Sequence, residues 1–139
     1  MLVLDTNMLS EMMRPEPERK IVDWIVRQPS TELFTAAVCQ AEILAGLAIL
    51  PGGRRRFDLE EAAHAMFADD FDGRILPFDT EAAASYAEIF AARRNVGRPS
   101  GVIDVMVAAI ARVRGASVVT RNVADFEGVG VAIINPWNE

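Results

Sequence analysis

The sequence predicts an α/β fold, a three-layer sandwich in which helices flank a mostly parallel sheet of about five strands. Three observations favour it. Short apolar runs recur along the chain, helical patterns separate almost every pair of them, and 139 residues suffice for one domain with a buried core. Alternating strands and helices form parallel sheets through crossover connections. We find no internal repeat or low-complexity linker, so we expect residues 1–139 to form a single domain.

The first half of the chain contains two predicted strands and four helical segments. In order, we expect a strand at 2–4, one or two helical turns at 8–13, a helix from about 18 to 28, a strand at 33–35, a helix at 38–50 and a helical segment from 54 to about 67. Arg14-Pro15-Glu16-Pro17 stops the first turns because proline lacks the N–H that a helix interior needs. Pro51-Gly52-Gly53 separates the last two helices in the same way.

The second half continues the alternation with three strands and two helices. We expect a strand at 75–78, a helix from 79 to about 94, a helix at 102–114 and strands at 117–120 and 131–134. Pro77 favours an edge or terminal position for its strand, since proline cannot donate to a ladder. Asp79 and Ser100 are residue types that cap helix N-termini, and Gly115 is typical of a helix end.

Composition excludes several classes of protein. Fourteen basic and 20 acidic residues give a net charge of −6, which argues against a basic nucleic-acid face. One cysteine and one histidine exclude a disulfide framework and a Cys/His zinc site, so carboxylates must do most of any chemistry. No apolar run is long enough for a bilayer and the N-terminus lacks a basic leader, so we expect a cytoplasmic chain without membrane contact.

Four acidic residues stand where a site can form. Asp5 follows the first predicted strand and Asp125 follows the fourth, at the sheet edge where parallel sheets bind ligands. Asp104 lies one turn into a helix, and Glu42 lies inside an otherwise apolar helix, where an unpaired acid is costly. Each alone has a simpler interpretation: a helix cap for Asp5, an interaction with the helix dipole for Asp104, a solvated helix edge for Glu42 and a turn brace for Asp125.

Repulsion decides what such a cluster requires. Two carboxylates about 4 Å apart repel by about 4 kcal/mol at an effective dielectric constant of about 20. That is a large share of a typical protein stability of about 5–15 kcal/mol. One acid therefore takes a proton, or a cation fills the space. Ligand sets made only of oxygen select Mg²⁺ or Mn²⁺ over zinc, and such an ion suits phosphoryl chemistry.

Four motifs carry a resemblance that covers nearly the whole chain. They are Leu4-Asp5-Thr6-Asn7, Ala41-Glu42-Ile43-Leu44-Ala45-Gly46, Asp104 with Ala108-Ala109, and Val119-Thr120-Arg121-Asn122 followed by Asp125-Phe126. In this order and spacing they resemble the PIN-domain ribonucleases, specifically the VapC-type toxins of bacterial toxin–antitoxin pairs. The segment from Ser10 to Trp24 is similar to the FitB-like branch of that family.

The resemblance implies an endoribonuclease that uses Mg²⁺ or Mn²⁺ to hydrolyse RNA phosphodiester bonds. Its catalytic and metal-binding acids would be Asp5, Glu42, Asp104 and Asp125. Asp5 and Asp104 would be the main ligands, Glu42 would hold metal or orient the attacking water, and Asp125 would act directly or through water. The residues implied to support this pocket are Thr6, Asn7, Thr120 and Asn122.

The resemblance also implies partners. They are a second copy in a homodimer and a small VapB-like antitoxin that covers the acidic pocket, giving a toxin–antitoxin hetero-oligomer that binds operator DNA only through the antitoxin. An alternative is a non-catalytic binding module of the same fold that acts with a DNA-binding partner in transcriptional regulation.

Arginine clusters are the remaining feature of interest. The runs Arg54-Arg55-Arg56 and Arg93-Arg94, with Arg98 nearby, either guide an RNA backbone or are solvated loop charges. We take Arg54, Arg55, Arg56 and Arg121 as the candidate RNA contacts.

Overall fold

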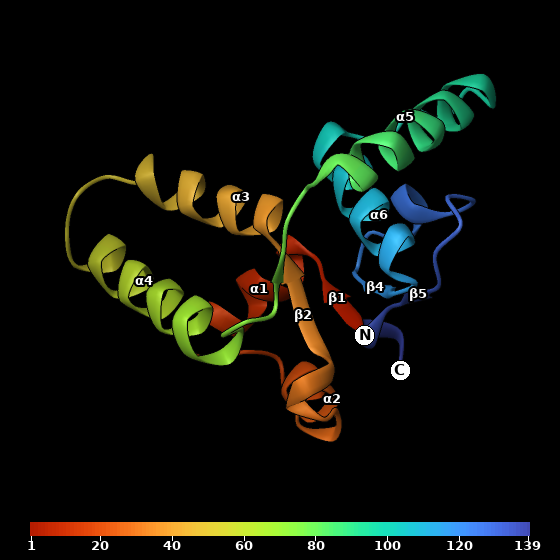
Figure 1. Ribbon diagram of the computed structural model, residues 1–139. Coiled ribbons are helices and arrows are strands. Elements are labelled where there is room, and N and C mark those ends of the chain that lie inside the picture. Colours follow the sequence, from red (N-terminus) through yellow and green to blue (C-terminus); the bar gives the residue numbers. More distant parts are fainter.

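A five-stranded parallel sheet forms the centre of the computed structural model, which describes residues 1–139 (Figure 1). The strands are β1 (Leu2–Leu4), β2 (Leu33–Ala36), β3 (Ile75–Leu76), β4 (Ser117–Val119) and β5 (Ile133–Ile134). Their order is β3-β2-β1-β4-β5, and all four pairings are parallel. The predicted α/β sandwich is therefore confirmed, with a sheet that is parallel throughout. β3 lies at the edge, as Pro77 indicates.

β1 is the central strand and sets the position of the site. Leu4 pairs with Thr35 of β2 on one side and with Val119 of β4 on the other. The chain builds the sheet from β1 outwards through β2 and β3, and then returns to place β4 and β5 on the opposite side. The strand order thus switches between β1 and β4. Ligands of parallel sheets bind at such a switch, beyond the carboxyl ends of the strands.

Six helices accompany the sheet. They are α1 (Thr6–Met13), α2 (Arg19–Arg27), α3 (Ala37–Ala48), α4 (Arg54–Ala65), α5 (Thr80–Asn95) and α6 (Val102–Arg114). Asp79 caps α5 by accepting from the Ala82 N–H at 3.0 Å, and Gly115 ends α6 with φ of 64°, both as expected. Some boundaries differ. α1 begins at Thr6 and not at Met8, so the segment directly after Asp5 is helical. β3 ends at Leu76 and β5 begins at Ile133, so these two strands are shorter than expected.

Two pairs of helices lie on different sides of the strands. Figure 1 shows the α3–α4 pair extending to one side and the α5–α6 pair to the other. The run 107–111 of α6 is fully buried because its small and branched side chains pack into the core. This burial fixes the helix that carries Asp104. No helix has the length and apolar character needed to cross a membrane.

Glu11 is a buried acid outside the predicted site, and it joins two helices. Its carboxylate accepts from Arg14 Nη1 at 3.1 Å and from the Glu18 N–H at 2.9 Å, which ties the end of α1 to the start of α2. We expect Glu11→Ala to lower the free energy of unfolding by about 1–3 kcal/mol, because it removes the buried carboxylate that accepts both hydrogen bonds. Urea denaturation measures the change. The exposed Glu16, whose side chain forms no hydrogen bond or ion pair, provides the control, and equal losses in Glu11→Ala and Glu16→Ala would contradict the assignment.

Candidate functional site

The four acids converge on one edge of the sheet. Asp5 directly follows β1, and its N–H donates to the Val119 carbonyl of β4 at 3.0 Å. Glu42 comes from α3, Asp104 from the first turn of α6, and Asp125 from η3 (Val123–Phe126), a 3-10 helix after β4. Asp104 experiences the charges of the other three. Elements far apart in the sequence thus bring together the carboxylates that the sequence singles out.

Asp5 is the most buried of the four, with 3% of its surface exposed. One carboxylate oxygen accepts from the Thr6 N–H at 2.8 Å, and the other accepts from Thr120 Oγ1 at 2.8 Å and from Asn7 Nδ2 at 3.3 Å. Burial raises the pKa of Asp5, and the charges of Glu42 and Asp125 raise it further. The hydrogen bonds from Thr120 and Thr6 lower that pKa but do not outweigh the burial.

Thr120 organises the residues around Asp5. Its hydroxyl donates to Asp5 and accepts from Asn7 Nδ2 at 3.1 Å and from the Asn122 N–H at 3.0 Å. Asn7 in turn accepts the Arg121 N–H at 3.2 Å. These contacts fix the rotamer of Asp5. Asn122 enters the network through its backbone, whereas its side chain is exposed and forms no hydrogen bond.

Asp104 is half-buried, and its pKa is raised to about 6. Desolvation is the largest cause, followed by the charges of Asp5, Asp125 and Glu42. The first turn of a helix favours an anion, but that effect is worth only about 0.3–1 kcal/mol. Burial and the neighbouring carboxylates outweigh it, so the helix-dipole interpretation does not account for Asp104.

Glu42 departs from the expectation that its helix buries it. α3 turns Ile43 and Leu47 to the core, whereas Glu42, one position before Ile43, lies on the exposed side of the helix. The carboxylate of Glu42 accepts from Thr6 Oγ1 at 2.5 Å. Thr6 thereby joins Glu42 to Asp5, because the Thr6 N–H donates to the Asp5 carboxylate. Glu42 therefore lies on a solvated edge of its helix, the simpler of the two interpretations, and Thr6 connects its carboxylate to the acidic cluster.

The donor set fits a hard divalent cation. None of the seven ion pairs of the chain includes Asp5, Glu42, Asp104 or Asp125, so their charge has no cationic side chain to balance it. No three His, Cys, Asp or Glu side chains lie close enough together in this structure to form a complete set of metal ligands. Carboxylate, hydroxyl and amide oxygens are the ligands that Mg²⁺ and Mn²⁺ prefer.

Cys39 lies beside this cluster without the properties of a nucleophile. Its thiol is buried 4.0 Å from Asp5 Oδ1. Burial, followed by the charge of Asp5, raises the pKa of Cys39 to about 12. The thiol is therefore protonated at neutral pH, and the site depends on its carboxylates.

Two of the candidate RNA contacts are paired within their own helix. Arg54 forms an ion pair with Asp58 at 3.2 Å, and Arg56 forms one with Glu60 at 3.1 Å. Exposed pairs at this spacing are weak, about 0.3–0.5 kcal/mol, so the pair leaves Arg54 available to a phosphate. Arg56 is held further, because its Nη1 also donates to the Leu50 carbonyl at 3.1 Å.

The other two candidates have different surroundings. Arg55 has no ion-pair partner and lines an open pocket of about 560 Å³ that Thr6 and Glu42 also line. The Arg121 guanidinium lies 5.1 Å from the centre of the Trp137 ring. Among the four candidate RNA contacts, Arg55 is thus the one that shares a pocket with an acid of the cluster, and Arg14 lines the same pocket.

Arg93 and Ser100 contact the Asp125 segment, which the sequence reading missed. Arg93 is buried rather than a solvated loop charge, and it donates to the carbonyls of Ala124 and Glu127. Ser100 does not cap α6, whose N-cap is Gly101; its hydroxyl donates to the Asp125 carbonyl. The sequence does contain a signal for the burial of Arg93. At helical spacing it continues the buried face of α5, whose other members are Ala82, Ser85 and Ile89.

Comparison with known proteins identifies similar chains over the full length. The family model described as "PIN domain" matches residues 2–131. A protein named VapC ribonuclease Y4jK from Sinorhizobium fredii is 39% identical over 137 residues, covering 99% of this chain and 98% of its own. A protein named Toxin FitB from Neisseria gonorrhoeae is 34% identical over 139 residues, covering 100% of both chains.

A solved structure agrees with these relatives. The structure of FitAB bound to an IR36 DNA fragment contains a chain that is 35% identical and superposes with a TM-score of 0.91, covering 99% of this chain and 96% of that one. The superposition covers 99% of this chain, so it includes the sheet and every element that carries one of the four acids.

Proposed function

The chain belongs to the PIN-domain family, and from this premise we propose that it is a Mg²⁺- or Mn²⁺-dependent ribonuclease that acts as the toxin of a toxin–antitoxin pair. The observation that carries the proposal is the convergence of four carboxylates, none with a cationic partner, at the strand switch of a parallel sheet. Relatives of nearly equal length are named ribonuclease and toxin, which supports the same activity here.

Each acid has a role that its surroundings support. Asp5, Asp104 and Asp125 would hold the divalent ion, with Asp5 oriented by Thr120. When bound, the ion neutralises the charge on the attacked phosphate and activates a water. Glu42 is exposed and is held only by Thr6, so its carboxylate is free to orient that water and accept its proton. Arg55 lines the same pocket as Glu42 and attracts the RNA backbone.

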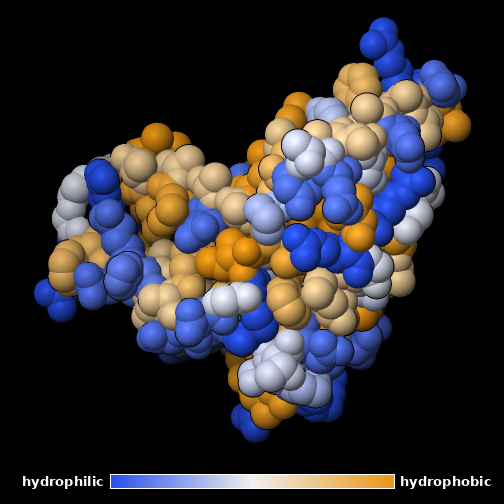
Figure 2. All heavy atoms as spheres, in the orientation of Figure 1, coloured by the Kyte–Doolittle hydropathy of each residue, from blue (hydrophilic) through white to orange (hydrophobic).

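We propose that an antitoxin covers the α3–α4 side of the molecule. Leu44, Ile49 and Phe57 are 49%, 85% and 57% exposed on this pair of helices, and Figure 2 shows hydrophobic side chains gathered there. Exposed apolar surface of this kind is typical of a partner interface. In the FitAB structure the similar chain is part of a complex bound to DNA. The assembly proposed here is a homodimer joined to a small VapB-like antitoxin, with operator DNA bound only by the antitoxin.

RNA cleavage by the purified chain, freed of partner, tests the proposal. We expect cleavage of cellular RNA with Mg²⁺ or Mn²⁺ and none with EDTA, and sequencing of the new ends identifies the target. A chain that binds a DNA-binding partner but cleaves no RNA with either ion is instead the non-catalytic module.

The hydroxyl of Thr120 gives a prediction of its own. Thr120→Val removes the hydrogen bond that orients Asp5, and we expect kcat for RNA cleavage to fall by about 10–100-fold, the range seen when a group that orients a metal ligand is removed. Thr120→Ser retains the hydroxyl and is expected to keep most of the activity. If serine and valine reduce kcat equally, the hydroxyl does not orient Asp5.

A further inference from the structure

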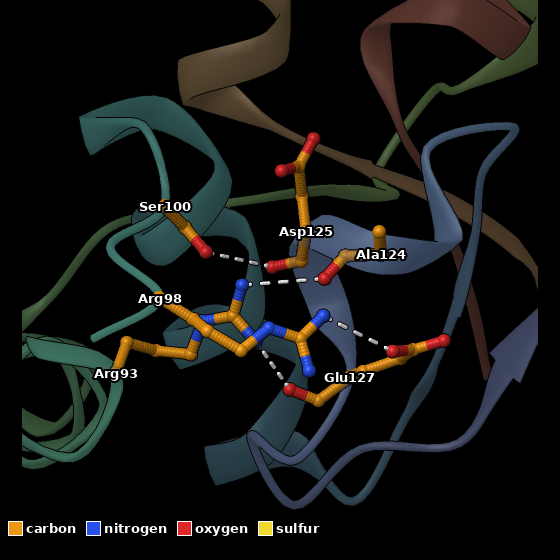
Figure 3. Close-up of polar contacts among 6 residues, drawn as sticks. All are labelled: Arg93, Arg98, Ser100, Ala124, Asp125 and Glu127. Atoms are coloured by element: carbon orange, nitrogen blue, oxygen red, sulfur yellow. Dashed lines mark hydrogen bonds and ion pairs between the residues drawn. The ribbon is translucent and has the colours of Figure 1, made fainter. Parts of the chain in front are cut away.

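Two side chains hold the backbone that carries Asp125: Arg93 from the last turn of α5 and Ser100 from the connection between α5 and α6 (Figure 3). Arg93 Nη1 donates to the Glu127 carbonyl at 2.7 Å and Arg93 Nη2 donates to the Ala124 carbonyl at 3.2 Å. Between these two carbonyls, the Asp125 carbonyl accepts from Ser100 Oγ at 3.0 Å. We call Arg93 and Ser100 together the η3 clamp.

Arg93 is an unusual buried charge. It is 6% exposed, none of the ion pairs of the chain includes it, and its Nε has no hydrogen-bond partner. A guanidinium away from both water and carboxylates loses hydration energy that only its remaining hydrogen bonds offset. Those bonds go to two backbone carbonyls, which the planar fork of arginine spans and a lysine ammonium does not. The side chain is thus matched to the shape of the η3 backbone.

η3 requires this external support. It has four residues, no side-chain cap at its N-terminus and the weak hydrogen-bond geometry of a 3-10 helix. Phe126 anchors it to the core with no exposed surface, but that contact fixes one residue only. In Figure 3 the Asp125 carboxylate points away from Arg93 and Ser100. The clamp therefore holds the backbone of Asp125 and leaves its carboxylate free for the site.

We propose that Arg93, assisted by Ser100, is a positioning residue that sets the direction of the Asp125 carboxylate in the acidic site. Arg98 extends the same contact, since its Nη2 pairs with the Glu127 carboxylate at 3.4 Å. The inference rests on the proposed function, because it assigns a task to Asp125 in metal binding and RNA hydrolysis.

Amide hydrogen exchange tests the clamp without reference to activity. Arg93→Lys keeps the charge but does not span both carbonyls, so we expect faster exchange at the amides of residues 123–127 and unchanged exchange in β1. Arg94→Lys is the matched control, because Arg94 is the exposed neighbour on the same helix and its side chain forms no hydrogen bond or ion pair. Ser100→Ala removes a single hydrogen bond and is expected to give a smaller change in the same direction, which keeps the test decisive if Arg93→Lys does not fold.

Metal affinity and a double-mutant cycle test the link to Asp125. We expect Arg93→Lys to weaken Mn²⁺ binding, measured by calorimetry on the whole chain, by about 10-fold, and to lower kcat for RNA cleavage with little change in KM. In an Asp125→Asn background the same Arg93→Lys change is expected to have no further effect, because the group that it positions is gone.

The outcomes separate the two proposals. Unchanged exchange at 123–127 in a chain that still cleaves RNA overturns the clamp, and so does an Arg93→Lys effect of equal size with and without Asp125. If the parent chain neither binds Mn²⁺ nor cleaves RNA, the proposed function fails and the positioning role fails with it.

Discussion

Asp5→Asn is expected to lower RNA cleavage by at least about 100-fold while the chain remains folded. Replacing a group that merely orients a metal ligand costs about 10–100-fold, and Asp5 is itself a proposed ligand, so its loss costs more. The substitution is nearly isosteric and retains an acceptor for the Thr6 N–H. Its new amide donor faces Thr120, whose hydroxyl can rotate, and Asn7, whose amide must turn.

Asp23→Asn serves as the control for this variant. Asp23 is an exposed aspartate on α2 whose side chain forms no hydrogen bond or ion pair, so we expect the same chemical change there to leave cleavage unaltered. Circular dichroism reports whether each variant folds, and initial rates with saturating Mn²⁺ report activity. An Asp5→Asn chain that cleaves as fast as the parent would remove the acidic cluster from the reaction.

Asp104→Asn is expected to remove most of the stabilisation that Mg²⁺ or Mn²⁺ gives. A ligand present at about 100 times its Kd raises the free energy of unfolding by about 2.7 kcal/mol, and thermal melts with and without the ion measure that increase. Asp104 is a proposed ligand, so the shift in Tm is lost with its charge. An undiminished shift in Asp104→Asn would mean that the ion binds elsewhere.

Without metal, in EDTA, Asp104→Asn is instead expected to raise the free energy of unfolding at pH 7. The folded pKa of Asp104, about 6, lies above the unfolded value of 3.8, so the folded state binds more protons between these values. Stability without metal therefore rises as pH falls from 7 to 5. The raised pKa of Asp104 corresponds to a gain of about 1 kcal/mol in the free energy of unfolding between pH 7 and pH 5, after a reduction for its partial exposure to solvent. Asp104→Asn removes this gain and is more stable than the parent at pH 7.

The contribution of Asp104 to the pH dependence is the difference in the free energy of unfolding between the parent and Asp104→Asn, measured at each pH. Other acids titrate in the same range, and their contribution is common to both chains. A parent and an Asp104→Asn chain with parallel stability curves from pH 5 to 7 would show that Asp104 has an ordinary pKa.

Two sequence expectations were wrong for physical reasons. The net charge of −6 argued against nucleic acid, whereas the relatives include a ribonuclease, because four of the acids gather at one site instead of spreading over the surface. The apolar sequence around Glu42 indicated burial, but α3 is covered on one side only, so its other side is exposed despite its apolar residues.

The sequence by itself determined the elements and the chemistry. Local periodicity and the turn residues predict each strand and helix, and the alternation predicts the parallel sheet. The sheet then places Asp5 and Asp125 beyond the ends of β1 and β4. Scarce His and Cys leave carboxylates as the reactive groups, which follows from composition alone.

Only the tertiary structure decided how these groups are held. Thr120 reaches Asp5 across 115 positions of sequence, Thr6 reaches Glu42 across 36, and Arg93 reaches the backbone on either side of Asp125 across about 30. Helix spacing places Arg93 on the buried stripe of α5, but it does not say which carbonyls lie opposite. Local patterns fix which face of an element is buried, whereas the atoms that meet across that face depend on the packing of elements distant in the chain.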